Sequence, residues 1–469
     1  MDRLTPVDAA FLTQEHEGSH MHIGAIMVFE GPAPRPEDFL EQIESRLHLV
    51  PRYRQKLAFP RFEMGRPLWV DDPCFNLGYH VRHSALPSPG SLEQLRLMAS
   101  RVYSQRLDRS KPLWEVWVVE GLADGRFALV NKAHHCLVDG VSGVDITTVL
   151  FDTQREPAAP PPAPERDWTP APEPSDADLV AEGIRGLART PVRLAARALS
   201  AASAPGRTLA GLREAAEGVG EVAWGILNGA AETPLNQPIG PHRRLAWTGV
   251  ELAELKAIKN ALGGTVNDVF LAVVSGALAR WHRDRGLRTE GLELRGCVPV
   301  SVRGEDERGS PGNRITVMTA PLPLYAEDPV DRLRIVSEAM KGLKESKQAL
   351  GAEVIVNLED FQPPTIFARA SRLHFSTRAY NLLVTNVPGP QFPLYLLGRE
   401  LDELIPVAFL APNQTLAVAI MSYNGKVNVS LIGDYDAMAD LEELVAHVGD
   451  CVAELRTVAE SKKMPAATT

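Results

Sequence analysis

The chain has 469 residues, of which 45% are apolar and 23% are charged, and its net charge is −10. This length is too great for one ordinary core and suits two domains of ~200 residues with connections. The composition is that of a soluble globular protein and excludes wholesale disorder, collagen and coiled coils. The acidic balance argues against a dedicated nucleic-acid binder, so we expect no nucleic-acid partner.

The cysteines and the apolar segments indicate the cellular compartment of the protein. The four cysteines lie far apart and form no CxxC pair, so we expect no disulfide framework, no cysteine-type zinc site and a reducing environment. No stretch approaches the ~18–20 apolar residues that cross a bilayer, and the longest, 269–279, is typical of a core helix. The first residues contain no apolar signal segment. The sequence predicts a cytoplasmic protein, with peripheral contact to the inner face of the membrane as an option.

Strands and helices alternate in the first part of the chain. Helical spacing covers 36–49 and 91–107, and the patterns of 22–30, 115–120 and 126–133 are typical of strands.

A change in composition divides the chain. Between Pro157 and Pro174, eight of eighteen residues are proline, which predicts a stiff, extended, solvated linker. An Ala/Gly/Arg-rich stretch follows it and is expected to be partly helical. We therefore expect an N-terminal half at 1–152, a linker at 153–232 and a C-terminal half at 233–469.

The linker contains a basic stripe. Between residues 178 and 213, six arginines outnumber two acidic residues, and four of them recur every fourth residue: Arg185, Arg189, Arg193 and Arg197. On helices interrupted near Pro191, this pattern predicts interfacial segments on anionic lipid, where each basic side chain contributes ~1 kcal/mol. A solvated or domain-packed connector is the alternative.

The second half contains two clear local signals. Asn424-Gly425 between alternating runs predicts a type I′ hairpin. Thr265 followed by Asp268 predicts a capping box that opens a helix to about Trp281. Because strands and helices interleave in both halves, the predicted fold class is α/β (α+β).

One motif contains candidate catalytic residues: HHCLVDG at 134–140, directly after a predicted strand. An imidazole held there can take a proton at neutral pH, since its ordinary pKa is ~6.5. Neighbouring side chains on a strand diverge, so His134 and His135 should not share a metal ion, and HExxH is absent. No GxSxG serine elbow occurs either. General-base chemistry without a covalent intermediate remains.

This motif resembles the HHxxxDG signature of the coenzyme A-dependent acyltransferase superfamily. Further segments make the chain similar to the bacterial wax ester synthase/acyl-CoA:diacylglycerol acyltransferase family. They are LTPVDA at 4–9, KPLWE at 111–115, TPLN at 233–236, VNDV at 266–269 and NVPGP at 386–390. One departure is Cys136, where this family most often has alanine.

The resemblance implies two chloramphenicol acetyltransferase-like domains, each a mixed sheet with helices, and an active-site tunnel between them. Acyl-CoA would enter as co-substrate from one side and a hydrophobic alcohol from the other, with no cofactor and no metal. His135 matches the family's general base, and His134 would support it. Asp139 would be structural or orienting. Asn267 would donate to the oxyanion, unless it only caps a helix.

The acceptor implied is diacylglycerol, giving triacylglycerol, or a long-chain alcohol, giving wax esters, collected at a membrane or lipid-droplet surface. Two other interpretations of the function stay open: a condensation-type transferase with a carrier-protein donor, and a non-catalytic lipid-binding protein. The residues that hold the coenzyme are not identified; basic candidates include 242–244, Arg283 and Arg285.

Overall fold

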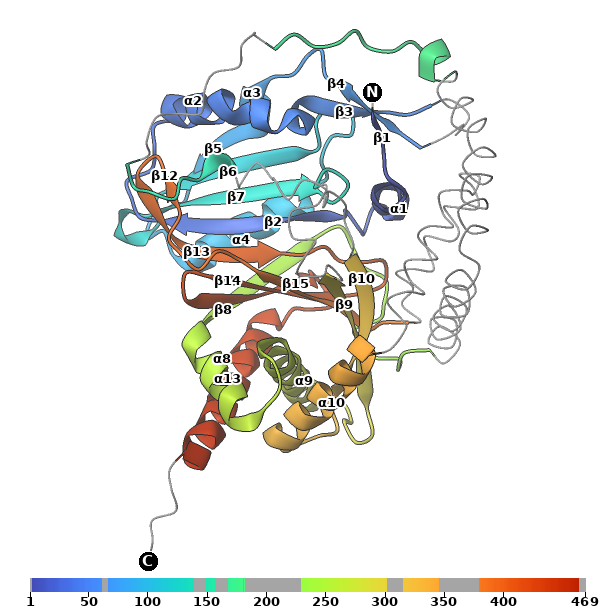
Figure 1. Cartoon of the computed structure of the whole chain (residues 1–469), viewed down its shortest axis with the longest axis vertical. Coiled ribbons are helices and arrows are strands. Elements are labelled where there is room, and N and C mark those ends of the chain that lie inside the picture. The colour runs from blue at the N-terminus through green and yellow to red at the C-terminus, as the bar shows by residue number, and fades with distance from the viewer. Residues whose placement is uncertain are drawn as a thin grey trace, which may run out of the picture.

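The computed structural model describes residues 2–60, 66–138, 149–156, 168–179, 181, 229–301, 315–345 and 379–463. These residues form two mixed six-stranded sheets, each with its own helices, and Figure 1 shows the two halves packed against each other. The predicted α/β (α+β) class is confirmed.

The N-terminal sheet has the strand order β12-β13-β2-β7-β6-β5. Every residue of the central strand β7 is buried, because it has a neighbour on both sides and layers on both faces. The patterns at 22–30, 115–120 and 126–133 are strands as predicted. The elements of this half are β2 (His22–Phe29), β5 (Val81–Ala85), β6 (Trp114–Glu120), β7 (Phe127–His134), α1 (Pro6–Gln14), α2 (Pro36–Arg46), α3 (Leu77–His80), α4 (Leu92–Ser104), and a small sheet of β1 (Asp2–Arg3), β3 (Gln55–Ala58) and β4 (Leu68–Asp71).

The C-terminal sheet has the order β10-β9-β11-β14-β15-β8. Helix α9 is buried along most of its length, and its capping box at Thr265 and Asp268 is formed as predicted. The hairpin at Asn424-Gly425 has the two positive φ angles, 44° and 83°, of a type I′ turn. The elements are β8 (Arg243–Glu251), β9 (Glu293–Ser301), β10 (Ile315–Pro323), β11 (Leu382–Pro388), β14 (Leu416–Tyr423), β15 (Lys426–Asp434), α8 (Leu252–Leu262), α9 (Val266–Asp284), α10 (Pro329–Glu345) and α13 (Leu441–Lys463).

Two strands cross from the C-terminal part of the chain into the N-terminal sheet. β13 (Arg399–Val407) pairs with β2 in an antiparallel register that aligns Ile405 with Ile26, and β12 (Tyr395–Leu396) pairs with β13. The residue boundaries predicted from composition do not anticipate this crossover. The two halves are therefore joined by a shared sheet as well as by surface packing.

Helix α4 holds the free edge of strand β8 through side chains spaced four residues apart. Ser104 and Ser100 accept hydrogen bonds from the backbone N–H groups of Arg243 and Leu245, at 2.8 and 3.1 Å. One turn further, the Arg96 guanidinium donates to the Trp247 carbonyl at 3.0 Å. Four helical residues rise about 6 Å and two strand residues about 6.6 Å, so the two spacings match.

Part of the proline-rich segment packs against the N-terminal half. Ala171 donates its N–H to Asp71 at 3.0 Å, and Glu173 forms an ion pair with Lys56 at 3.0 Å. The Trp168 ring lies under the Arg54 guanidinium. This end of the predicted linker is thus docked on β3 and β4, whereas Arg185, Arg189, Arg193 and Arg197 lie outside the described residues.

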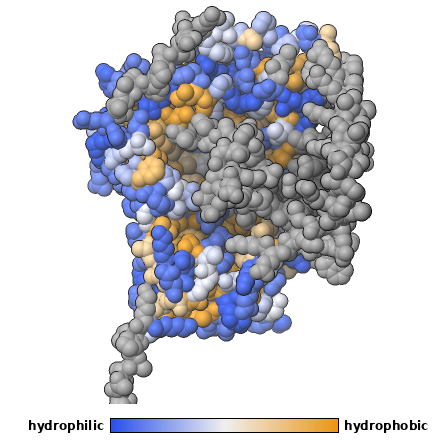
Figure 2. All heavy atoms as spheres, in the orientation of Figure 1, coloured by the Kyte–Doolittle hydropathy of each residue, from blue (hydrophilic) through white to orange (hydrophobic). Residues whose placement is uncertain are grey.

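No single described helix is long and apolar enough to cross a membrane; α8 and α9 pass that test only as a pair, bent by 95°. On the face drawn in Figure 2, apolar residues reach the surface in separate patches among polar ones in both halves. All four cysteines are free thiols.

Candidate active site

Strand β7 delivers the two histidines of the motif to its C-terminal end. β7 ends at His134, whose N–H donates to the Leu113 carbonyl at 3.0 Å. The chain then turns, with the Leu137 N–H donating to the His134 carbonyl at 2.9 Å. The His135 N–H donates to the carbonyl of Met21, just before β2, at 2.9 Å. Both backbones are therefore fixed to neighbouring segments of the sheet.

The His135 imidazole lies in an aromatic environment. It stacks on the Phe11 ring of α1, with centroids 3.8 Å apart and an interplanar angle of 18°, and meets the Phe409 ring edge-on at 5.5 Å. Burial lowers the pKa of His135 to about 4, so the ring is uncharged at neutral pH. Nδ1 is buried, while the residue as a whole is half-buried. A proton on Nδ1 leaves the lone pair on Nε2, which can act as a base.

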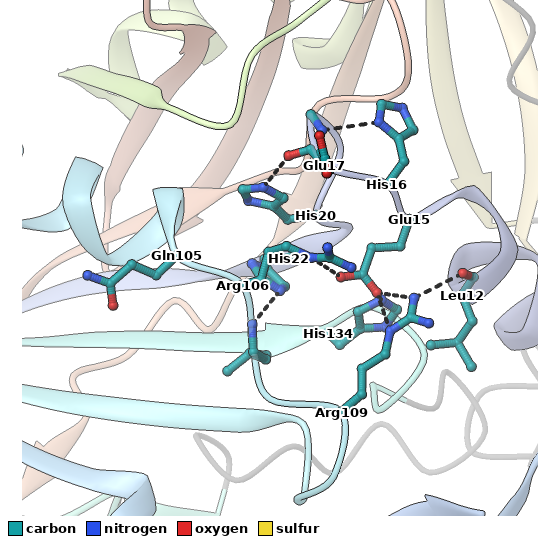
Figure 3. Close-up of polar contacts among 12 residues, drawn as sticks. Leu12, Glu15, His16, Glu17, His20, His22, Gln105, Arg106, Arg109 and His134 are labelled. Atoms are coloured by element: carbon teal, nitrogen blue, oxygen red, sulfur yellow. Dashed lines mark hydrogen bonds and ion pairs between the residues drawn. The ribbon is translucent and has the colours of Figure 1, made fainter. Parts of the chain in front are cut away.

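His134 points to a different set of groups, as expected of neighbours at a strand end. Its Nδ1 accepts a hydrogen bond from the Cys136 N–H at 3.1 Å, which places the ring proton on Nε2. Nε2 lies 3.5 Å from a carboxylate oxygen of Glu15, the residue after α1 (Figure 3). Burial lowers the pKa of His134 despite this carboxylate. The structure thus gives His134 a neutral, oriented ring.

Glu15 is at the centre of an ionic cluster that sequence reasoning missed. Its side chain is 1% exposed, and it accepts hydrogen bonds from Arg109 and, at 3.1 Å, from Arg106 (Figure 3). Burial opposes ionisation of Glu15, but the contacts with His134 and Arg109 outweigh it and lower the pKa to about 2. Nothing local in the sequence connects Glu15 with arginines 91 and 94 residues later.

Further histidines lie near the motif. His22 is paired across the sheet with His134, and its ring meets that of His134 edge-on at 6.1 Å. His20 lies 5.5 Å from His22, and burial lowers the pKa of both. Among the described residues, no group of three or more His, Cys, Asp or Glu side chains could hold a metal ion.

Asn267 lies in the first turn of α9, in the other half of the molecule. Its Oδ1 accepts a hydrogen bond at 3.1 Å from Asn386 of β11, so the predicted VNDV and NVPGP segments meet. The helix cap is made by Thr265 and Asp268, which exchange hydrogen bonds at 2.8 and 3.2 Å. Asn267 is therefore not needed as a cap. Asp139 lies outside the described residues.

Two of the basic candidates for coenzyme binding are used by the fold. Arg243 is buried and donates to the carbonyls of Gly18, Gly240 and His242. Arg285 forms an ion pair with Asp440 at 2.7 Å and covers the Trp281 ring. Both guanidinium groups thus make their described contacts within the chain.

Cys136 is a poor candidate for a nucleophile. Its side chain is buried, and burial raises the pKa of its thiol well above the ordinary value. Because the thiolate is the reactive form, this thiol is inert at neutral pH. Its side chain instead belongs to the hydrophobic core of the N-terminal half.

Comparison with known sequences identifies relatives over nearly the whole chain. Residues 4–270 match the family model for the wax ester synthase/diacylglycerol acyltransferase catalytic domain, and residues 311–456 match that for the WS/DGAT C-terminal domain. "Probable diacyglycerol O-acyltransferase tgs1" of Mycobacterium tuberculosis (strain CDC 1551 / Oshkosh) is 35% identical over 99% of this chain and 98% of its own. "Probable diacyglycerol O-acyltransferase tgs2" of the same strain is 31% identical over 97% and 99%.

Solved structures agree with this result. The wax ester synthase/diacylglycerol acyltransferase from Marinobacter aquaeolei VT8 superposes with a TM-score of 0.67, at 27% identity, over 98% of this chain and 100% of that chain. The first condensation domain of the CDA synthetase has a TM-score of 0.58 at 17% identity, over 96% of each chain, and so shares the fold. The resemblance and the two-domain fold predicted from the sequence are confirmed.

Proposed function

The chain belongs to the wax ester synthase/diacylglycerol acyltransferase family, and we propose that it transfers a long-chain acyl group from acyl-CoA to diacylglycerol, with His135 as the general base. The observation that carries this proposal is the uncharged, half-buried imidazole of His135, fixed by α1 at the end of β7. Acyl-CoA is a co-substrate in this reaction, which needs no other cofactor.

In the proposed mechanism, the lone pair on Nε2 of His135 takes the hydroxyl proton of the acceptor as its oxygen attacks the thioester carbonyl. The C–S bond then breaks, and the proton passes to the departing thiolate of coenzyme A. Base catalysis of this kind contributes ~10²–10⁴-fold, and positioning both substrates side by side adds to it. The inert thiol of Cys136 supports direct transfer without an acyl-enzyme.

The remaining motif residues have supporting roles in this proposal. His134, oriented by Glu15 and the Cys136 N–H, supports the turn that carries His135. Asp139 is structural or orienting. Asn267 donates its amide to the oxyanion, since Asn386 occupies its carbonyl oxygen.

Long-chain alcohols are a second acceptor class, which would make the chain a wax ester synthase as well. Both acceptors have a hydroxyl on an apolar body, so the same base serves either one. We also propose that the enzyme collects them at a membrane or lipid-droplet surface, through the basic stripe of the linker. The halves at 1–152 and 233–469 then form the catalytic body, in which β12 and β13 of the C-terminal half join the N-terminal sheet.

The direct test incubates purified protein with radiolabelled palmitoyl-CoA and either dioleoylglycerol or hexadecanol. We expect labelled triacylglycerol, and the ratio of the two products gives the acceptor preference. In a parallel reaction without acceptor, no label should remain on the denatured protein. Absence of both products would support a lipid-binding protein or a carrier-dependent transferase, and label lost in Cys136→Ala would point to a covalent route.

A further inference from the structure

Two phenyl rings from distant parts of the chain meet the imidazole of His135. Phe11 stacks on the imidazole at 3.8 Å, Phe409 meets the imidazole edge-on at 5.5 Å, and the two phenyl rings are 5.8 Å apart at 76°. Phe11 lies on α1, near the N-terminus, and Phe409 follows β13, which crosses over from the C-terminal half. Both phenylalanines are 6% exposed. One face and one side of the imidazole are therefore covered by residues from two distant segments of the chain.

The backbone of His135 is fixed separately, through its N–H bond to Met21 at 2.9 Å. With the backbone held, the side chain keeps only its two torsions, and the phenyl rings in contact with the imidazole limit rotation about them. Close-packed interiors resist such movements, because neighbouring rings cannot be displaced without loss of contacts.

We propose that Phe11 and Phe409 are positioning residues that clamp the imidazole of His135 in the orientation in which Nε2 receives the acceptor's proton. This inference rests on the proposed role of His135 as the base. In this proposal, the segment that follows the crossing strand β13 contributes to catalysis through Phe409. The C-terminal half thus helps to orient a base that the N-terminal sheet carries.

The two phenyl rings also shield part of the imidazole from water. The charged and titratable groups around the two histidines are Asp8 and Glu15 at the two ends of α1, Arg106 and Arg109 after α4, and His22 of β2. Of these groups, Glu15 forms its ionic contact with His134. The described segment 408–411, which lies beside His135, contains only apolar residues. Removing a clamp ring should therefore change the solvation of His135 more than its charge environment, and its pKa should rise toward 6.5.

The experiment compares Phe11→Leu and Phe409→Leu with Phe39→Leu, a fully buried phenylalanine of α2 that loses the same ring elsewhere in the N-terminal half. Initial rates are measured against acyl-CoA and dioleoylglycerol from pH 4 to 9. Thermal unfolding confirms that each variant is folded at the assay temperature. Phe11→Tyr restores a ring at the stacking position.

We expect kcat to fall about 10- to 100-fold in both clamp variants, with KM nearly unchanged, since small displacements of a catalytic group have effects of this size. The acid limb of kcat/KM should move to higher pH, and Phe11→Tyr should recover most of both changes. If both clamp variants had the same kinetics as Phe39→Leu, the proposed clamp would be wrong. If His135→Ala in the same series stayed active, the proposed base itself would be wrong instead.

Discussion

The Glu15 carboxylate lies 3.5 Å from Nε2 of His134, although 118 residues separate the two in the chain. α1 makes this contact possible, because Glu15 caps the helix one turn after Phe11, and its N–H donates to the Phe11 carbonyl at 3.1 Å. One helical turn thus serves both histidines: Phe11 covers His135, and Glu15 orients His134.

Glu15→Gln should weaken both stability and catalysis. The change leaves Arg106 and Arg109 without their shared carboxylate and replaces the charge beside His134 with a neutral, weaker acceptor. Because both arginines can regain water, we expect the free energy of unfolding to fall by about 2–3 kcal/mol, near the low end for a broken buried ion pair. We also expect kcat to fall about tenfold, through a less ordered His134.

Urea denaturation and initial rates measure the two effects, with Glu254→Gln as the control. Glu254 forms a half-exposed ion pair with Arg456 at 2.7 Å and lies on α8. Equal behaviour of the two variants would show that the cluster around Glu15 has no special role.

The protein should lose stability in mild acid. Burial lowers the pKa of seven described histidines: His16, His20, His22, His80, His134, His135 and His282. Below pH 6.5 the unfolded chain binds protons on these rings and the folded chain does not, so the free energy of unfolding falls as the pH drops from 6.5 toward 4. The lowered pKa of Glu15 extends the loss from pH 4.5 toward 2.

Each histidine with a pKa of about 4, His20 and His135, should account for about 2 kcal/mol of this loss at pH 5. Urea midpoints at pH 7.5 and pH 5 give the measurement, and His20→Gln should reduce the difference between them. A midpoint that is equal or higher at pH 5 would show that these rings are protonated in the folded protein.

Asn267→Ala should reduce kcat about 10²-fold, the usual effect of removing one oxyanion donor, while KM changes little. Asn386→Ala should have a smaller effect in the same direction, because it frees the Asn267 amide to rotate. Asn260→Ala, on the exposed side of α8, is the control. A kcat for Asn267→Ala that matches the control would remove Asn267 from the mechanism.

Replacing Arg185, Arg189, Arg193 and Arg197 with glutamine should abolish flotation with anionic liposomes. The parent protein should float at low salt and less at high salt, because the attraction is electrostatic. A matched variant replaces four exposed arginines elsewhere: Arg35, Arg101, Arg334 and Arg456. Unchanged flotation of the stripe variant would show that the segment is a plain connector that does not bind lipid through these arginines.

Local patterns predicted much of the fold. The apolar strand patterns of β2 and β7, the capping box of α9 and the Asn424-Gly425 turn depend on residues close together in sequence, and all are present. The HHxxxDG motif is equally local, so the base could be proposed from sequence.

Long-range pairings could not be predicted. β13 joins β2 by backbone hydrogen bonds that leave no mark in the side-chain pattern of either strand. Glu15 directly follows α1, and only the folded chain brings Arg106 and Arg109 beside it. For the same reason, the stacking of Phe11 on His135 has no signal in the sequence.

The most direct test of the account is the kcat of His135→Ala, compared with His282→Ala. His282 is also a buried histidine with a lowered pKa, but it lies near the far end of α9. With palmitoyl-CoA and dioleoylglycerol, we expect His135→Ala to lose about 10²–10⁴-fold in kcat while remaining folded, and His282→Ala to stay near the parent value. A His135→Ala enzyme that turns over as fast as His282→Ala would contradict general-base catalysis by His135.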